Sequence, residues 1–298
     1  MFEFFASIFG YVLNFIYQLV NNYGLAMILF TLVIKLLMLP LSIKQQRMLK
    51  KNAKMQEKMK VLQFKYKSDP EKLNQEMMSL YKTENMSPFS GCLSTILQFI
   101  LLISIFYMVR SPLTFMKKVD TNTINSYVEQ IKQEGKSVSA AYPEIDLIRE
   151  IDYLKEKNPE DGQVEKLGIN MEFLGLDLSK IPQQNLADWT VYIIPVLYIL
   201  STFVSMKITT SMQAGQKKKK EQEVIDITEK KEENKEETSA EEEFDAMAQT
   251  NKMMSWMMPI MSVSISLVAP LGLALYWLVN NIAMIVERLV LNKLIKED

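Results

Sequence analysis

The 298-residue sequence contains no histidine and a single cysteine, Cys92. Structural zinc sites are built from cysteine and histidine ligands, and histidine is the usual general base, so both kinds of site are excluded. One cysteine also cannot form a disulfide within the chain. The sequence contains no phosphate-binding loop either, so we expect no metal, no cofactor and no enzymatic activity.

Charged residues are missing from several long stretches, although the net charge of the whole chain is only −1. Uncharged runs of about 16 to 22 residues are long enough to cross much of a bilayer and are not expected in a soluble domain. They occupy residues 23–43 (Lys35 apart), 88–109, 189–206, 253–269 and 271–286. The sequence therefore predicts an all-α, polytopic membrane helix bundle of five spans.

The N-terminal segment has a different pattern, with polar residues on one helical face and apolar side chains around the rest. The polar residues are Glu3, Ser7, Asn14, Gln18 and Asn21. This pattern predicts an amphipathic helix that lies at the membrane interface. The segment lacks a basic region and a small-residue cleavage site, so we do not expect a signal peptide; an uncleaved anchor is the alternative.

Lysine and arginine indicate the orientation, because they determine topology more strongly than acidic residues do. No basic residue precedes Lys35, whereas residues 44–87 contain eleven. We therefore expect the N-terminus outside and the C-terminus in the cytoplasm. The expected segments are an interfacial helix (1–22), span one (23–43), a cytoplasmic helical hairpin (44–87), span two (88–109), an extracytoplasmic loop (110–188), span three (189–207), a cytoplasmic disordered loop (208–252), span four (253–270), and span five with a short tail (271–298).

The predicted hairpin has two arms in which apolar residues recur at helical spacing. These residues are Met55, Met59, Leu62 and Tyr66 in the first arm and Leu73, Met77 and Leu80 in the second. Between the arms, residues 68–71 (Ser-Asp-Pro-Glu) supply a helix cap, an early proline and the glutamate of a capping box. A methionine-rich seam suits varied apolar partners, and a self-packed coiled coil is the alternative.

Two further loops differ in kind. Residues 213–248 are mostly Glu, Lys, Gln and Thr, so they cannot bury enough apolar surface to fold and are expected to be disordered. In the outer loop, apolar residues at helical spacing within 144–157 predict short surface helices. We infer no chemistry from the outer loop.

Lys35 is the one charge inside the first predicted span. A cation near the middle of a bilayer costs roughly 2.5–3.5 kcal/mol on insertion-derived scales, which suggests that it has a function. Lys35 precedes Lys44 by nine residues, or about 13 Å along a helix. Snorkelling to the interface is the alternative, but it recovers only part of that depth.

Polar residues are concentrated in the cytoplasmic halves of the predicted spans. They are Ser94, Thr95 and Gln98 in span two and Ser201, Thr202 and Ser205 in span three, while Ser255, Ser262 and Ser266 fall on one stripe of span four. Singly, such residues bond to their own backbone or hold helices together. Their shared depth predicts a wet recess that opens to the cytoplasm, whereas a pore would need polar residues through both halves.

Several stretches resemble the YidC-type membrane protein insertase family. The last two spans contain a methionine-rich start with Met-Pro (258–259) and then PLGLALYWLVNN (270–281); span two opens with PFSGCL (88–93); span one runs from NYGLA (22–26) to LPLSIKQ (39–45); and FLGLDL (173–178) precedes span three. The matches follow one another through all five spans. They imply the short, five-span bacterial form, in the plasma membrane.

The resemblance implies that the chain inserts newly made membrane proteins. Its implied partners are nascent membrane proteins and the phospholipid bilayer, with the ribosome and the Sec translocon as further candidates and no specific nucleic acid. In the implied substrate groove, Lys35 attracts acidic residues of a substrate's outward-going tail. The groove residues implied are Lys35, Ser94, Thr95, Gln98, Ser205 and Trp277.

The sequence departs from the family pattern at several of these positions. Lys35 stands where arginine is usual, so the planar fork that binds a carboxylate at two points is lost. Ser94 and Ile100 replace two prolines, a glutamine is replaced near Ser205 and Met206, and Glu287 replaces a glutamine. Two rival functions are a small secondary transporter or channel with Lys35 as a counter-charge, and an assembly scaffold with the hairpin as its docking arm.

Overall fold

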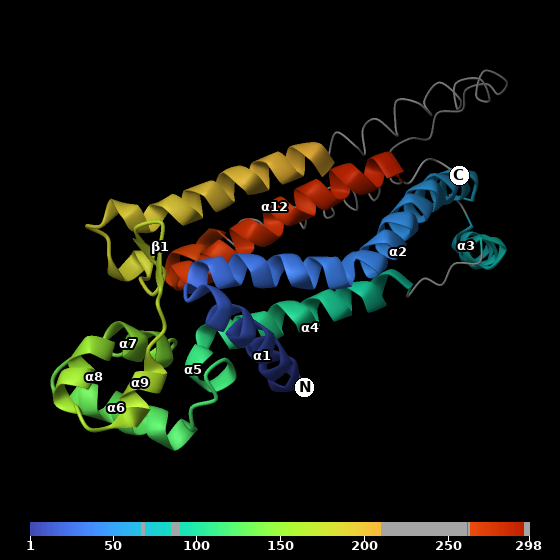
Figure 1. Ribbon diagram of the computed structural model, residues 1–298. Helices are drawn as coiled ribbons and strands as arrows, with labels where there is room; N and C mark the ends of the chain where they lie inside the picture. The colour runs from blue at the N-terminus through green and yellow to red at the C-terminus, as the bar shows by residue number, and fades with distance from the viewer. Residues whose placement is uncertain (67–68, 85–89, 210–260, 262, 295–298) are drawn as a thin grey trace.

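In the computed structural model the described part of the chain is mostly helical. The structure describes residues 1–66, 69–84, 90–209, 261 and 263–294, without the side chains at some helical positions that include 90–95. Figure 1 shows long helices side by side, with a smaller helical domain at one end of them. The long elements are α1 (Phe2–Val20), α2 (Tyr23–Lys65), α4 (Ser90–Arg110), the helix 193–209 and α12 (Leu271–Leu294).

Four of the described helices are long and apolar enough to cross a membrane. They are Phe2–Val20, Tyr23–Met48, Trp189–Thr209 and Leu271–Leu294, and a shorter apolar helix covers Ile96–Arg110. Most of the fourth predicted span, 253–270, and the segment 213–248 lie outside the described residues, although 263–268 are helical. The prediction of an all-α, multi-pass membrane protein is confirmed.

Helix α2 is 43 residues long and joins the first predicted span directly to the first arm of the hairpin. Asn22 caps it, because its side chain accepts a hydrogen bond from the Leu25 amide at 2.9 Å. Pro40 lies inside the helix, where proline removes one backbone hydrogen bond and favours a bend. Figure 1 shows α2 bending partway along, so that its second half leaves the bundle at an angle.

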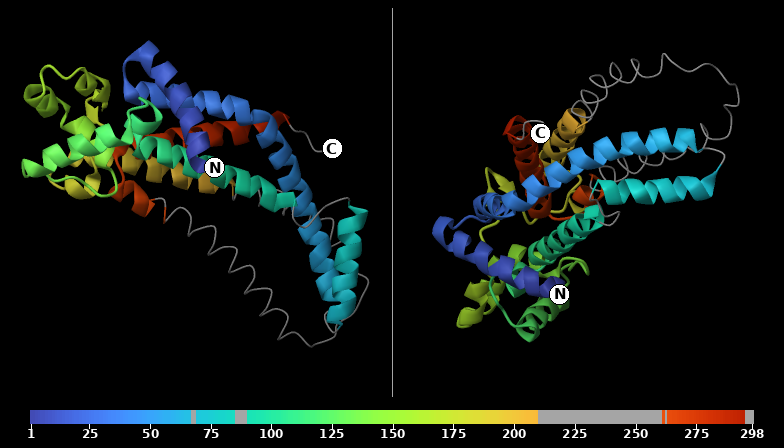
Figure 2. Two further views of the ribbon diagram at one scale, coloured as in Figure 1. Left: turned by 90° about the horizontal axis from the view of Figure 1, so that it is seen from below. Right: turned by 90° about the vertical axis from the view of Figure 1, so that its right-hand side faces the viewer.

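Helix α3 (Pro70–Thr83) forms the second arm and packs beside the end of α2 (Figure 2). Asp69 caps α3 by accepting a hydrogen bond from the Lys72 amide at 3.0 Å. Met55 is buried, and the Tyr81 hydroxyl donates to the sulfur of Met59 at 3.8 Å. The methionines of the seam therefore pack at least partly within the hairpin itself.

Helix α1 runs obliquely across the bundle and packs on α2 and α4 near the small domain (Figures 1 and 2). Phe9 meets Phe30 of α2 edge to face, with ring centroids 5.9 Å apart. Gly10 lies against the backbone of Phe115, where a Cβ atom would come within 2.0 Å of the carbonyl oxygen. The close approach of these two segments therefore requires glycine at position 10.

Around its axis α1 has three sectors, because consecutive residues turn by about 100° in a helix. One sector is buried in the bundle and contains Ala6, Phe9, Leu13 and Ile16. The second contains the polar residues Glu3, Ser7, Asn14, Gln18 and Asn21. The third is apolar and exposed, and contains Phe4, Ile8, Tyr11, Phe15 and Leu19. This arrangement suits a helix that contacts protein, water and lipid together; the interfacial position stays a prediction.

Residues 111–188 form a small domain with a buried core, which goes beyond the short surface helices predicted for the outer loop. Its elements are α5 (Pro112–Phe115), α6 (Thr121–Gln133), α7 (Pro143–Arg149), α8 (Ile151–Lys157), α9 (Gly162–Leu167), an antiparallel pair of short strands β1 (Glu172–Phe173) and β2 (Leu176–Asp177), and a turn of 3-10 helix, η1 (Pro182–Gln184). A second such turn, η2 (Trp189–Tyr192), opens the next span. The helices expected within 144–157 are α7 and α8, and their residues Ile145, Ile148 and Leu154 are buried.

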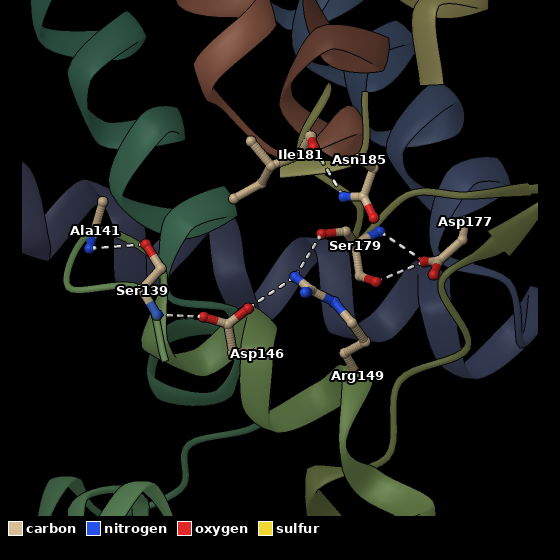
Figure 3. Close-up of polar contacts among 8 residues, drawn as sticks. All are labelled: Ser139, Ala141, Asp146, Arg149, Asp177, Ser179, Ile181 and Asn185. Carbon is tan, nitrogen blue, oxygen red and sulfur yellow. Dashed lines mark hydrogen bonds and ion pairs between the residues drawn. The ribbon is translucent and has the colours of Figure 1, made fainter. Parts of the chain in front are cut away.

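A polar network connects α7 to the segment that leads back to the bundle (Figure 3). The Asp146 carboxylate accepts a hydrogen bond from the Ser139 amide at 2.7 Å and pairs with Arg149, also at 2.7 Å. Arg149 also donates to the carbonyl oxygen of Ser179 at 3.3 Å, and the Ser179 hydroxyl donates to Asp177 at 2.6 Å. Burial raises the pKa of Asp146, while the hydrogen bond from Ser139 and the charge of Arg149 oppose the increase.

The small domain also fixes the starts of two long helices. The Leu271 and Gly272 amides, at the start of α12, donate to the carbonyl oxygens of Lys180 and Leu178, each at 2.9 Å. The Tyr23 amide, at the start of α2, donates to a carbonyl oxygen of the same domain at 2.9 Å. These bonds satisfy N-terminal amides that have no partner within their own helix. The hairpin lies at the opposite end of the bundle (Figure 1).

Glu144 is a buried carboxylate that holds the start of α5 against α7. It accepts hydrogen bonds from the Leu113 amide at 2.7 Å, the Thr114 amide at 3.0 Å and the Thr114 hydroxyl at 2.6 Å. Burial raises its pKa above the ordinary 4.5, and the hydrogen bonds oppose this increase. Because its pKa is raised in the folded state, Glu144 contributes most to stability below that ordinary value and less as the pH rises.

We expect Glu144→Ala to lower the free energy of unfolding of the small domain by about 2–4 kcal/mol, because buried donors lose their acceptor. Glu144→Gln keeps an acceptor oxygen and should lose less. The measurement is the urea dependence of proteolysis within residues 111–188, made on the full chain in detergent.

The same measurement across pH tests the ionisation of Glu144. In the wild-type chain the stability should fall as the pH rises from 4.5 through the raised pKa. Glu144→Gln cannot ionise, so its profile should lack this part of the fall. Identical pH profiles for the two proteins would contradict the assignment.

Candidate functional site

Lys35 of α2 and Glu287 of α12 form an ion pair, with Nζ and Oε2 3.5 Å apart. Lys35 is about 18 Å along α2 from Tyr23, and Glu287 is about 24 Å along α12 from Leu271, at 1.5 Å per residue. Lys35 therefore lies near the middle of the span Tyr23–Met48, and Glu287 lies in the half of α12 away from the small domain. The Lys35 side chain is 25% exposed and the Glu287 side chain 13%.

The sequence predicts a lone cation in span one, and the structure corrects this prediction by giving Lys35 an acidic partner. Opposite charges at similar depths in spans one and five are the signal that connects them. The two charges can be recognised as a pair only when it is known that α2 packs against α12. An ion pair removes much of the cost of a single charge within apolar helices.

Gln98 connects α4 to α2 in the same half of the bundle. Its side-chain amide donates to the Gln45 side-chain oxygen at 2.8 Å, and Gln98 is exposed. Among the described residues, α2 and α4 make few close backbone contacts with each other, so two long side chains connect them. Ser94 and Thr95, predicted to lie near Gln98, have side chains outside the described part of the chain.

Polar contacts also connect α12 to the helix 193–209. The Asn281 side-chain amide donates to the Ser201 hydroxyl at 2.8 Å and to the Thr202 hydroxyl at 3.3 Å. About two helical turns further along α12, Arg288 donates to the hydroxyl of Thr209. Ser201 and Thr202 therefore hold two helices together, which is the ordinary role of such residues in membranes.

Ser205 and Trp277, both predicted groove residues, belong to this second interface. Ser205 is 6% exposed, and the Trp277 ring lies 6.0 Å from that of Tyr198. Trp277, Asn281 and Arg288 share one face of α12, whereas Glu287 lies about 100° around the helix from Arg288. Among the described groove residues, Ser205 and Trp277 therefore belong to the interface of α12 with the helix 193–209, whereas Lys35 contacts α12 at Glu287, about 100° around the helix.

Several serines and threonines bond to their own helix. Thr31 donates to the carbonyl oxygen of Met27, Ser104 to that of Ile100 and Ser266 to that of Val263, each at 2.7 Å. This is the alternative that the sequence left open for isolated polar residues in a span. Depth alone therefore does not identify a recess residue.

Apolar side chains flank the ion pair on the outer surface of the bundle. Leu36 and Leu37, next to Lys35, are 70% and 64% exposed. Exposed apolar side chains of the neighbouring helices are Ile96 and Phe99 on α4 and Ile282 and Val286 on α12. In a membrane such a surface contacts lipid, so the charged pair lies close to the lipid-facing side of α2. Within the described residues, no three Cys, Asp or Glu side chains are grouped as a metal site would need.

The chain is similar in sequence to a known protein family and to known proteins. The family model described as "60Kd inner membrane protein" matches residues 15–298. The membrane protein insertase YidC of Caldanaerobacter subterraneus subsp. tengcongensis is 44% identical over 102 residues, which are 34% of this chain and 50% of that protein. The protein of the same name from Francisella tularensis subsp. novicida is 43% identical over 109 residues, 37% of this chain and 20% of that protein.

The aligned parts thus span half or less of these relatives. The family model, in contrast, extends over nearly the whole chain, including the predicted spans and the small domain. The resemblance to YidC-type insertases that the motifs indicate is confirmed. The chain belongs to the 60Kd inner membrane protein family.

Proposed function

We propose that this chain inserts newly made membrane proteins into the bacterial plasma membrane. The observation that carries the proposal is the partly exposed Lys35–Glu287 pair within apolar helices of a chain whose relatives are named membrane protein insertases. An ionised group at this depth is costly, so its presence indicates a function. A substrate that briefly contains polar residues within the membrane would use such a group.

In the proposed mechanism the protein lowers the cost of moving a short polar tail across the bilayer. An unpaired polar group in hydrocarbon costs several kcal/mol, so a hydrated, charged recess in the inner half shortens the apolar path. Lys35 attracts an acidic residue of the tail, and Gln98 and Gln45 offer hydrogen bonds about 15 Å further along α2 toward the hairpin. The exposed apolar surface beside Lys35 then releases the apolar part of the substrate to lipid.

The proposed orientation follows from the distribution of lysine and arginine. The hairpin carries most of the basic excess, so its end of the bundle is cytoplasmic and the small domain is outside. The N-terminus is then outside and the C-terminus in the cytoplasm. The hairpin is placed to meet a ribosome or the Sec translocon, and α1 to lie at the outer interface. The proposed step needs no nucleotide, metal or covalent intermediate.

The first prediction concerns the charge at position 35. Lys35→Arg should insert an acidic-tailed reporter about as well as the wild type, because arginine keeps the positive charge. Lys35→Gln should insert it several-fold less. The measurement is protease protection of the reporter tail in vesicles that contain the purified chain. Equal insertion by all three proteins would sink the role of the charge, and uptake of small solutes by the same vesicles would favour the transporter.

The second prediction is that the hairpin is required for insertion. Removing 50–84, which takes away most of the second half of α2 and all of α3, should abolish insertion while leaving the bundle in the membrane. Replacing 213–248 by a short Gly/Ser linker is the matched control and should retain insertion. The opposite result would reverse the two assignments.

The third prediction concerns water in the recess. After Cys92→Ser, a cysteine at the exposed position 98 should react with a polar thiol reagent applied from the cytoplasm. Leu29 and Leu197 are exposed apolar residues nearer the small domain, and cysteines there should react far more slowly because lipid surrounds them. Position 205 should also react slowly, because Ser205 is buried.

A control position must be exposed, so that slow labelling reports lipid and not burial by protein. Met27 lies in the same region but is fully buried by protein, so it does not meet this requirement. A cysteine at position 27 would react slowly whether or not water reached that depth. Comparable labelling at 98, 29 and 197 would indicate a pore through both halves and favour the channel. Absence of labelling at 98 would mean that the inner half is dry.

A further inference from the structure

We propose that Glu287 determines the charge specificity of insertion, as a built-in counter-ion to Lys35. The inference rests on the proposed function. Glu287 pairs with Lys35 when no substrate is present, so an acidic substrate residue must displace one carboxylate to bind. A basic substrate residue pairs with Glu287 at the same place. The site therefore admits tails of either charge.

The geometry of the pair supports exchange rather than a permanent lock. The 3.5 Å separation of Nζ and Oε2 is at the long end of the hydrogen-bond range, and Lys35 is one-quarter exposed. Partly exposed pairs are weakened by water, so a competing charge can replace either partner. Lysine favours such exchange, because it is a flexible point charge without the rigid fork of arginine.

The burial of Glu287 limits how much an acidic tail gains. Its side chain is about half as exposed as that of Lys35. When a substrate carboxylate takes Lys35, Glu287 loses its ion pair and keeps its electrostatic interaction with Arg288, and a poorly hydrated anion without an ion-pair partner is unfavourable. The net gain is then the difference between two similar pairs, whereas a lone lysine would give the whole attraction. Glu287 thus reduces the preference for acidic tails.

The neighbouring cation does not replace Lys35 in this role. Arg288 follows Glu287 in the chain but lies about 100° around α12, where it donates to Thr209. Its contact is with the helix 193–209, on the face that carries Asn281 and Trp277. Lys35 and Glu287 therefore act as a pair on the face of α12 toward α2, and Arg288 belongs to the interface behind it.

The experiment measures selectivity between three reporters that differ at one residue of the translocated tail: Asp, Gln or Lys. The purified full chain is placed in phosphatidylethanolamine and phosphatidylglycerol vesicles with no imposed membrane potential, which would itself favour one charge. Insertion is read as protease-protected tail. The quantity compared is the Asp-to-Lys ratio, because it cancels differences in the amount of active protein between variants.

Glu287→Gln should raise the Asp-to-Lys ratio, and Lys35→Gln should lower it, each by about threefold or more, as expected for a partly exposed ion pair. The double variant Lys35→Gln/Glu287→Gln should return the ratio close to the wild-type value, although insertion of both charged reporters falls relative to the Gln reporter. Glu150→Gln removes one partner of the Lys136–Glu150 pair in the small domain. It is the matched control and should leave the ratio unchanged.

An Asp-to-Lys ratio that Glu287→Gln leaves unchanged would overturn the inference, while the proposed function would stand if the wild type inserts the Gln reporter. A shift in Glu150→Gln equal to that in Glu287→Gln would also overturn it, because the effect would then be a general one of surface charge. Failure of the wild-type chain to insert any of the three reporters would instead count against the proposed function itself.

Discussion

The structure depends on one constraint: a polar group placed within apolar helices must find a partner, because hydrocarbon offers none. The buried Asn14 Oδ1 and Tyr23 hydroxyl have no hydrogen-bond partner, but at other described positions this chain meets the constraint with contacts between helices as well as within them. Gln98 reaches Gln45, Lys35 reaches Glu287, and Asn281 reaches Ser201. In order, these contacts connect α4 to α2, α2 to α12, and α12 to the helix 193–209. Polar side chains that are costly singly thereby fix which helices are neighbours, in a solvent where apolar burial contributes little to helix association.

The small domain supplies the second set of constraints. It binds backbone amides at the starts of α2 and α12 and so places two helix ends at one level. Within the domain, Arg149 connects α7 to the segment whose carbonyl oxygens accept the α12 amides. It contacts Asp146 on one side and the Ser179 carbonyl on the other (Figure 3). Because α2 and α12 start at the same end of the bundle, Lys35 and Glu287, about 18 and 24 Å along their helices, come within reach of each other without any local sequence signal. The distant ion pair is therefore partly a consequence of packing at the opposite end of the helices.

The sequence predicts what is local in this fold and leaves open what depends on pairing. Uncharged runs and helical spacing predict the spans and the cap of α3, because both are properties of consecutive residues. They do not predict that α2 continues through Pro40 into the hairpin, since proline is read as a probable boundary. They also do not tell apart a serine that bonds to its own helix, such as Ser104, from one that does so and also accepts a bond from another helix, such as Ser201. Lys35 is predicted as the important charge, but its partner is not, because the register between α2 and α12 is not written in either helix alone.

The pairing of Lys35 with Glu287 also resolves two opposed requirements on a charge in this position. A strong, lone cation would attract acidic segments well but would burden the empty protein with an unpaired charge among leucines. A fully buried ion pair would not open for a substrate, because separating it leaves both charges in apolar surroundings. The observed pair lies between these limits, with a long separation and unequal exposure of its two members. Such a pair is stable enough to exist without substrate and weak enough to exchange. The same reasoning explains why lysine is compatible with this position: a site that must release its partner gains nothing from the two-point grip of arginine.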